Sequence, residues 1–280
     1  MHKKTLVVVF SLAILLAGCG NDEYAVEKRY WQAQQEANKI FKNPHSSPPR
    51  ELDRVAKILS AFSQKYPNTK LAVEADFNIA RLYLIKEAYD KGRMQLRATI
   101  NKYRANFAIC AEALFLIGNS YQIEGKWNLA LEQYKKIMQD YPKTIRGLNI
   151  PIYIAQYYKI KYQPDKMLTA YQEAIAYYRS LAEKYPNSAL SYSVDILVAQ
   201  CYVALKDWQN ALSSFKTILE EYKGKVANLD AVLMNISVLY MNELKDKIKA
   251  REMLQRLIKE YPKSRLAKPA IALLKEMDKK

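Results

Sequence analysis

The chain has few of the residues on which enzymes and metalloproteins rely. Its 280 residues include two histidines, three cysteines and seven glycines. His45 is the only histidine after residue 18, and no carboxylate–histidine–cysteine cluster has the spacing of metal ligands. Neither a glycine-rich phosphate loop nor a G-x-S-x-G turn occurs. We therefore expect no enzyme, no cofactor and no bound metal.

Long apolar runs are also scarce. The only one, at residues 5–16, follows two lysines and is too short to span a bilayer comfortably. It ends in Leu16-Ala17-Gly18-Cys19, which resembles the lipobox of bacterial lipoproteins, where the cysteine is acylated and the preceding peptide removed. We predict a signal peptide at 1–18 and a lipidated Cys19 in a short tether at 19–23. The alternative is an ordinary secretory signal with an incidental cysteine.

Acidic residues are outnumbered by basic ones. The chain has 44 lysines and arginines against 28 acids, a net charge of +16 that falls to +14 without residues 1–18. A basic chain outside the cytoplasm does not meet nucleic acid. Its expected counterparts are anionic lipid headgroups, an acidic partner surface or a cell-wall polymer. A solvated basic surface without a dedicated partner is an equal alternative.

One phrase recurs along the rest of the chain. The complete phrase Tyr-Pro-x-Ser/Thr begins at Tyr66, Tyr141, Tyr185 and Tyr261. Degenerate versions without the proline begin at Tyr103 and Tyr222. Successive tyrosines are 37, 38, 44, 37 and 39 residues apart. Proline ends a helix, and the Ser or Thr two residues later can cap the next one. The period predicts a stacked array of helical units, with a longer turn or helix near Pro164 and one inserted residue in the last unit.

The stretch at 111–142 has the most complete internal pattern. Its apolar and small positions are Leu114, Ile117, Gly118, Tyr121, Ala130, Tyr134, Ile137 and Pro142. Gly118 and Ala130 are small where two antiparallel helices would touch most closely. This pattern resembles the tetratricopeptide repeat, W-x₂-L-G-x₂-Y…A-x₃-F…P, with leucine at the first, aromatic position.

The resemblance implies an all-α, right-handed superhelical solenoid of about six tetratricopeptide-like helical hairpins plus a C-terminal capping helix. The repeat domain is expected at 24–280. Its units are expected at about 24–67, 71–104, 108–142, 147–186, 190–223 and 228–262, with the cap at 266–278. Cys110 and Cys201 lie on the first helices of units two apart, too far for a disulfide, so we expect both to be small core residues.

In such arrays a partner binds the concave groove, lined mainly by the first helix of each unit. One register position gives an apolar ladder of Phe77, Phe115, Ile152, Ile196 and Met234. Four residues later stands a mostly amide ladder of Arg81, Asn119, Gln156, Gln200 and Val238. Amides can donate to and accept from a peptide backbone, which suits an extended segment or a helix in the groove. Alternatively, the apolar ladder packs against neighbouring helices. Relatives that clamp a C-terminal carboxylate have lysine in the apolar ladder, and this chain has none there.

Repeat lipoproteins with these Tyr-Pro endings resemble the outer-membrane β-barrel assembly lipoprotein D and the repeat domain of the Tol–Pal coordinating protein. The first has about five units, the second has a preceding coiled coil that is absent here, and a secretin pilotin is a third relative. The resemblance implies a lipid-anchored scaffold that binds envelope proteins and assists their assembly or positioning. We expect it to face the periplasm, in the outer membrane if the host has two membranes. The alternative is a structural protein that acts on membrane or cell wall through its basic surface.

Overall fold

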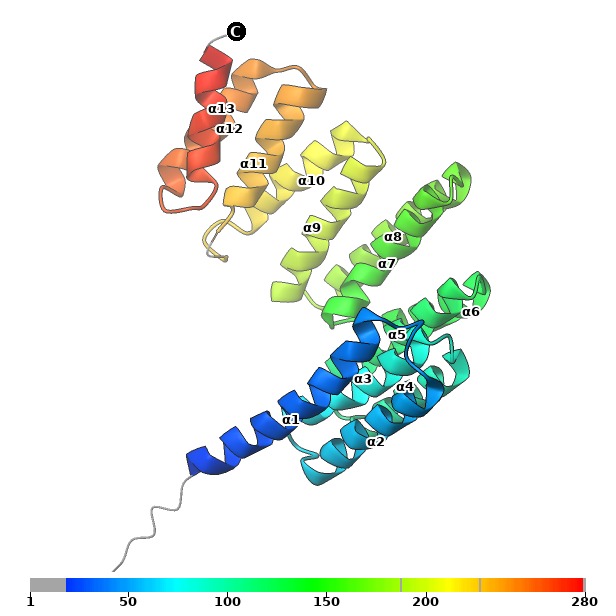
Figure 1. Ribbon diagram of the computed structural model, residues 1–280. Coiled ribbons are helices and arrows are strands. Elements are labelled where there is room, and N and C mark those ends of the chain that lie inside the picture. The colour runs from blue at the N-terminus through cyan, green and yellow to red at the C-terminus, as the bar shows by residue number, and fades with distance from the viewer. Residues whose placement is uncertain (1–18, 187, 227, 279–280) are drawn as a thin grey trace, which may run out of the picture. The chain divides into compact units, whose positions relative to one another are not determined.

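All regular structure in the described part of the chain is helical. The computed structural model describes residues 19–186, 188–226 and 228–278, with side chains from Glu23 onward. No strand occurs within these ranges (Figure 1). The all-α class predicted from the repeat pattern is therefore confirmed. The predicted signal peptide at 1–18 and the side chain of Cys19 lie outside the described residues.

The helices follow one another as six pairs and a closing helix. The first helices are α1 (Cys19–Lys42), α3 (Lys70–Ile85), α5 (Phe107–Ile123), α7 (Ile145–Ile160), α9 (Ala189–Ala204) and α11 (Asp230–Val238). The second helices are α2 (Pro49–Lys65), α4 (Tyr89–Lys102), α6 (Trp127–Asp140), α8 (Pro164–Lys184), α10 (Trp208–Glu221) and α12 (Lys247–Glu260). The closing helix α13 (Ala267–Asp278) packs against α12, as expected for a cap.

These helices divide between two compact units that meet in sequence at Lys126 and Trp127. In unit 1, α3 packs against α1, α2 and α4, and α4 packs against α5. In unit 2, each helix from α6 to α13 packs against the next one. The boundary falls inside the repeat expected at 108–142. A repeat in a stacked array contacts only the repeats next to it, so no single core has to run through the whole chain.

The same turn follows the first helix in five of the pairs. One residue of each turn has φ between +53° and +76°, and these residues are Glu87, Gly125, Tyr162, Lys206 and Lys245. The next residue donates its backbone N–H to a tyrosine carbonyl oxygen in the preceding helix at 2.8–3.0 Å. This bond satisfies a carbonyl at the helix end, as in a Schellman motif, and requires the left-handed residue. Only one of the five positions is the glycine that such a turn favours.

The predicted helix caps are present at three of the four Tyr-Pro phrases. The hydroxyls of Thr69, Thr144 and Ser188 accept the backbone N–H three residues on, at 3.1, 3.0 and 3.1 Å. Each hydroxyl satisfies a backbone donor that the first helical turn leaves open. Ser264 differs because α13 begins three residues later. Its hydroxyl donates to the Asp230 carboxylate and accepts the Leu266 N–H.

Two irregularities in the repeat spacing have simple structural causes. Helix α8 has 21 residues, whereas α4, α6, α10 and α12 have 14 each. The extra length therefore lies in this helix and not in the turn before it. The single inserted residue of the last unit lies where α11 passes into a π-helix at Leu239–Glu243. A π-turn takes one residue more than an α-turn, so it absorbs the insertion without breaking the helix.

Each unit has its own apolar core. Fully buried side chains of unit 1 include Ile40, Leu59 and Leu82, and those of unit 2 include Leu233 and Leu254. As predicted, Cys110 and Cys201 are buried, as are the small residues Gly118 and Ala130. Repeat spacing thus identified the core positions correctly on both sides of the boundary.

Candidate binding groove

The predicted groove residues form pairs four residues apart on the first helices, so each pair occupies one helix face. Unit 1 carries Phe77 and Arg81 on α3, and Phe115 and Asn119 on α5. Unit 2 carries Ile152 and Gln156 on α7, Ile196 and Gln200 on α9, and Met234 and Val238 on α11. The two units therefore have to be considered separately.

On α3, Phe77 is covered by contacts within unit 1. Phe77 is 7% exposed, and the Arg81 guanidinium lies 6.0 Å from the centroid of its ring. Arg81 Nη1 also donates to Asn78 Oδ1 at 3.2 Å, and Asn78 Nδ2 donates to the Tyr30 hydroxyl at 3.1 Å. Phe77 is thus a core residue here, and Arg81 is the member of this pair that faces solvent.

The pair on α5 is more accessible than Phe77. Phe115 and Asn119 are both half-buried. One turn further on, Ile123 is 68% exposed at the C-terminal end of the helix. This face of unit 1 therefore combines aromatic, amide and apolar surface.

Unit 2 presents the clearest polar positions. Gln156 and Gln200 are exposed, and among the described residues neither side chain makes a hydrogen bond. Each amide can donate two hydrogen bonds and accept through its oxygen. Ile152 and Ile196, one turn before them, are half-buried. These two helices can therefore offer both backbone recognition and apolar contact.

The apolar ladder of unit 2 also serves its core. Ile196 and Met234 are half-buried and pack against the main apolar cluster of the unit. Val238, which begins the passage into the π-helix, is half-buried too. Partner binding and packing against neighbouring helices are thus compatible roles for the apolar ladder, because one part of each side chain packs inward and another part remains accessible.

A further apolar position at the ends of the first helices was missed by the sequence reasoning. Ile85, Ile123 and Ile160 are 38%, 68% and 73% exposed. Each follows the small residue of its repeat by five positions, after Ala80, Gly118 and Ala155. The regular spacing was the signal that could have found them. Single exposed apolar residues are normal, but a repeated one adds surface to the groove helices.

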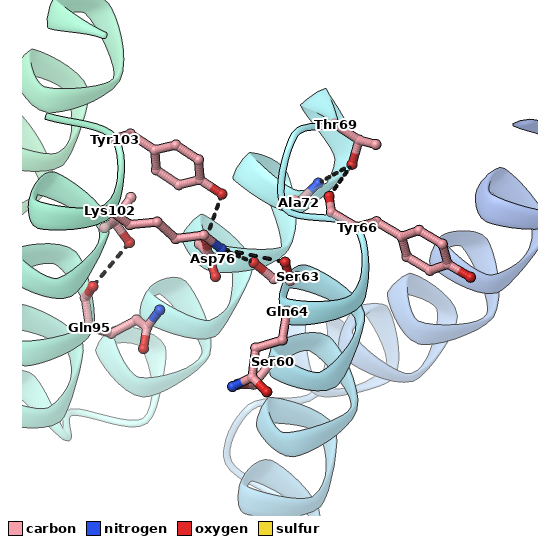
Figure 2. Close-up of polar contacts among 11 residues, drawn as sticks. Ser60, Ser63, Gln64, Tyr66, Thr69, Ala72, Asp76, Gln95, Lys102 and Tyr103 are labelled. Carbon is pink, nitrogen blue, oxygen red and sulfur yellow. Dashed lines mark hydrogen bonds and ion pairs between the residues drawn. The ribbon is translucent and has the colours of Figure 1, made fainter. Parts of the chain in front are cut away.

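A polar network fixes α3 between its neighbours in unit 1. Figure 2 shows the Lys102 ammonium between Asp76 and Ser63. Lys102 Nζ lies 2.8 Å from Asp76 Oδ2 and 2.5 Å from Ser63 Oγ, and the Tyr103 hydroxyl donates to Asp76 Oδ2 at 2.8 Å. Burial lowers the pKa of Lys102, but its bonds to Asp76 and Tyr103 outweigh burial and leave the pKa raised.

Among the described residues, the equivalent carboxylate in unit 2 makes no ion pair. Asp195 also stands four residues before a small core residue, and it accepts from the Tyr222 hydroxyl at 2.7 Å. The residue before that tyrosine is Glu221, where unit 1 has Lys102. Burial raises the pKa of Asp195, and the hydrogen bond from Tyr222 opposes this shift. The sequence marks both of these tyrosines, because Tyr103 and Tyr222 end the two units whose Tyr-Pro phrase lacks its proline.

The second helices of unit 2 border a pocket of about 330 Å³ beside α7. Pro151 and Ile154 line it from α7, and Leu131 and Met138 line it from α6. Pro151 occupies the register position of Leu114 and Leu233. The pocket can accept an apolar side chain, but none of the predicted ladder residues lines it.

The described residues give no sign of metal chemistry or of a membrane span. No group of three His, Cys, Asp or Glu side chains among them could hold a metal ion. Likewise, none of the described helices is both long enough and apolar enough to cross a bilayer.

The repeat architecture is confirmed by comparison with known families. The tetratricopeptide repeat model matches residues 112–144, 157–188, 197–224 and 231–264. The chain therefore contains tetratricopeptide repeats, which form scaffolds for protein–protein interaction. Three matches end at Tyr-Pro phrases, and the other at the degenerate phrase of Tyr222.

Several solved structures are similar to this chain. The C-terminal part of a tetratricopeptide-containing protein of Cytophaga hutchinsonii is 16% identical, with a TM-score of 0.45 over 89% of this chain and 98% of that chain. BtubC of P. vanneervenii is 16% identical, with a TM-score of 0.42 over 84% and 90%. PilF of Pseudomonas aeruginosa is 12% identical, with a TM-score of 0.36 over 86% and 95%. No curated protein matches the sequence.

Proposed function

We propose that this chain is a lipid-anchored scaffold of a bacterial cell envelope that binds envelope proteins and assists their assembly or positioning. Tetratricopeptide repeats supply the binding architecture, and the Leu16-Ala17-Gly18-Cys19 sequence supports the anchor. We propose that the anchor lies in the outer membrane of a two-membrane host, with the repeats facing the periplasm. The absence of aspartate at Gly20 and Asn21 supports this sorting.

The observation that carries the binding proposal is the state of Gln156 and Gln200. They occupy the same register position on the first helices of successive pairs within unit 2. Both are exposed, without side-chain hydrogen bonds among the described residues, and each follows a half-buried isoleucine by one turn. An extended partner segment can pair its backbone with such amides while its side chains contact the isoleucines.

A crosslinking experiment identifies the partner and tests the groove. A photo-crosslinking amino acid is placed at Gln200 in intact cells, and at Gln209 on α10, which is also exposed, as a control. The proposal expects an envelope protein to be captured at position 200 and not at 209. Capture of the same protein at both positions, or at neither, contradicts a groove.

The captured protein then allows the amides to be measured. Replacing Gln156 and Gln200 by alanine removes hydrogen bonds worth about 0.5–1.5 kcal/mol each, so two bonds predict roughly 5- to 150-fold weaker binding. The matched control replaces Gln172 and Gln209, which are exposed on second helices. Both variants should melt like the parent. Equal affinity of the two variants would remove the amides from the binding site.

The anchor has its own test. Cys19→Ser should leave an unprocessed or soluble protein, because the acyl chains supply nearly all of the membrane affinity of a lipoprotein. Fractionation of cells and the mass of the N-terminal peptide measure this outcome. Normal processing and retention in the membrane fraction would contradict the lipoprotein proposal, and would favour the basic surface as the membrane contact.

A further inference from the structure

The tip between α7 and α8 in unit 2 exposes three apolar or aromatic side chains close together in the sequence. Ile160 is 73% exposed and Tyr162 is 92% exposed. Leu168, on the second turn of α8, is 45% exposed. At 1.5 Å of rise per residue, Leu168 lies only about 6 Å along its helix from the tip.

Comparison with the equivalent turns shows that the tip residue is unusual. The left-handed position is occupied by Glu87, Gly125, Lys206 and Lys245 in the other four turns. Only Tyr162 places an aromatic ring there, at φ +53°. A bulky residue with positive φ is strained, and strained residues gather at functional sites. The strain at Tyr162 does not favour folding, and its exposed ring does not favour solubility. A different role therefore has to account for this residue.

Basic residues flank Tyr162 in the sequence. Lys159, Lys161 and Lys166 are all exposed, and Asp165 is the one acid within residues 159–168. Lys161 Nζ lies 5.9 Å from the Tyr157 ring centroid, and Lys166 Nζ lies 5.8 Å from that of Tyr158. These cation–π contacts keep two of the positive charges close to the tip.

We propose that this tip inserts into the headgroup region of an anionic bilayer, as a second membrane contact besides the anchor. Tyrosine favours the boundary between headgroups and acyl chains, where its ring is buried and its hydroxyl stays wet. Ile160 follows the ring into the apolar layer, and the lysines meet anionic headgroups while their stems cover apolar surface. The inference does not depend on the groove.

The test measures depth at the tip in the full chain. Tyr162→Trp is reconstituted into phosphatidylcholine vesicles with and without phosphatidylglycerol, carrying brominated acyl chains that quench a nearby indole. The parent chain supplies the background of its own tryptophans. Ile145→Trp, at the other end of α7 and 80% exposed in the parent, is the matched control.

The proposal expects added quenching at position 162 in the anionic vesicles, weaker quenching in the neutral ones, and none at position 145. Because the readout is local, it differs from that of an anchor alone. Lys159→Glu with Lys161→Glu should abolish it, whereas Lys135→Glu with Lys136→Glu, exposed on α6, should not. High salt should weaken the quenching at position 162.

Equal quenching at positions 162 and 145 would overturn the proposal, and so would quenching that does not depend on the tip lysines. A protein crosslinked at position 162 without quenching would assign the tip to a protein partner.

Discussion

Unit 1 and unit 2 are built from the same repeat, but they join their helices with different chemistry. In unit 1, the Arg93 side chain is 7% exposed, and its Nη1 lies 2.5 Å from an oxygen of Glu124, which is 9% exposed. Its Nη2 donates to Asp90 at 2.6 Å. The guanidinium carbon also lies 4.3 Å from the centroid of the Tyr121 ring. A buried ion pair therefore connects α4 to the end of α5.

Unit 2 uses aromatic rings in a comparable role. Trp127 of α6 stacks on Tyr157 of α7, with ring centroids 3.3 Å apart and planes at 4°. Its indole N–H donates to the Tyr158 hydroxyl at 3.1 Å. Tyr134 and Tyr153 meet edge to face beside them. Aromatic contacts tolerate the loss of one member better than buried ion pairs do, because no charge is left without a partner.

The largest expected effect is the loss of the buried cation in unit 1. Arg93→Ala leaves Glu124 buried with only the more exposed Lys126 as a cation, which predicts a loss of about 3–5 kcal/mol. Urea unfolding followed by far-UV circular dichroism measures it. Arg93→Met combined with Glu124→Leu should recover much of the loss, because it removes both charges together. A loss below about 1 kcal/mol for the single variant would show that the ion pair is not essential.

The matching change in unit 2 should cost less. Trp127→Ala removes the stack and the hydrogen bond of a half-buried ring, for which we expect about 2–3 kcal/mol. Trp31→Ala is the control, because this ring is 59% exposed and its loss should be within about 0.5 kcal/mol. The same unfolding measurement applies. Equal losses for the two tryptophans would contradict a structural role of the aromatic stack.

Asp76→Asn tests the charged network of Figure 2. The amide keeps an acceptor for Tyr103 but loses the ion pair with Lys102, which predicts a loss of about 1–2 kcal/mol at neutral pH. The raised pKa of Lys102 gives this contribution a definite pH dependence. It is complete below the unfolded pKa of lysine and disappears as pH rises through the folded pKa. Parent and variant should therefore converge in alkaline solution, and a constant difference would contradict the ion pair.

The left-handed turn is common to both units and should respond alike in each. Gly125→Ala in unit 1 should cost about 1 kcal/mol, because a Cβ is unfavourable at φ +76°. Nothing lies within 4 Å of the added atom, so crowding makes no contribution. Lys206→Gly in unit 2 should be neutral or gain up to about 1 kcal/mol. Thermal melting measures both changes, and a destabilised Lys206→Gly would show that its stem makes a needed contact.

The smallest effect has the opposite sign from that of Asp76. Asp195→Asn keeps an acceptor for Tyr222 and removes a carboxylate that makes no ion pair within the described part of the chain, so we expect a gain below about 1 kcal/mol at pH 7. The folded pKa of Asp195 is raised, so its ionised form costs stability above that pKa. The cost disappears as pH falls to the unfolded value near 4. Melting curves at several pH values should show the advantage of the variant vanishing in acid.

The contrast between the two aspartates shows how far sequence reasoning reached. Asp76 and Asp195 occupy equivalent register positions, and the structure gives both a tyrosine hydroxyl. Their different environments depend on residues 102 and 221, which come from the following helix and carry opposite charge. In the same way, sequence placed Phe77 and Ile196 in one ladder, but burial differs because the neighbouring side chains differ. Periodicity predicts which face a residue occupies, and it does not predict what covers that face.

The sequence by itself determined the helical class, the six pairs and most of the caps. These features depend on local rules, namely the three-and-four spacing of apolar residues, the proline stops and the hydroxyl caps. The tertiary structure decided that the chain forms two units and that a longer α8 accounts for the longest interval between repeat tyrosines. It also decided that Tyr162 is exposed in a strained turn. Such features depend on how helices pack and which side chains then remain outside, and packing is a property of neighbours far apart in the sequence.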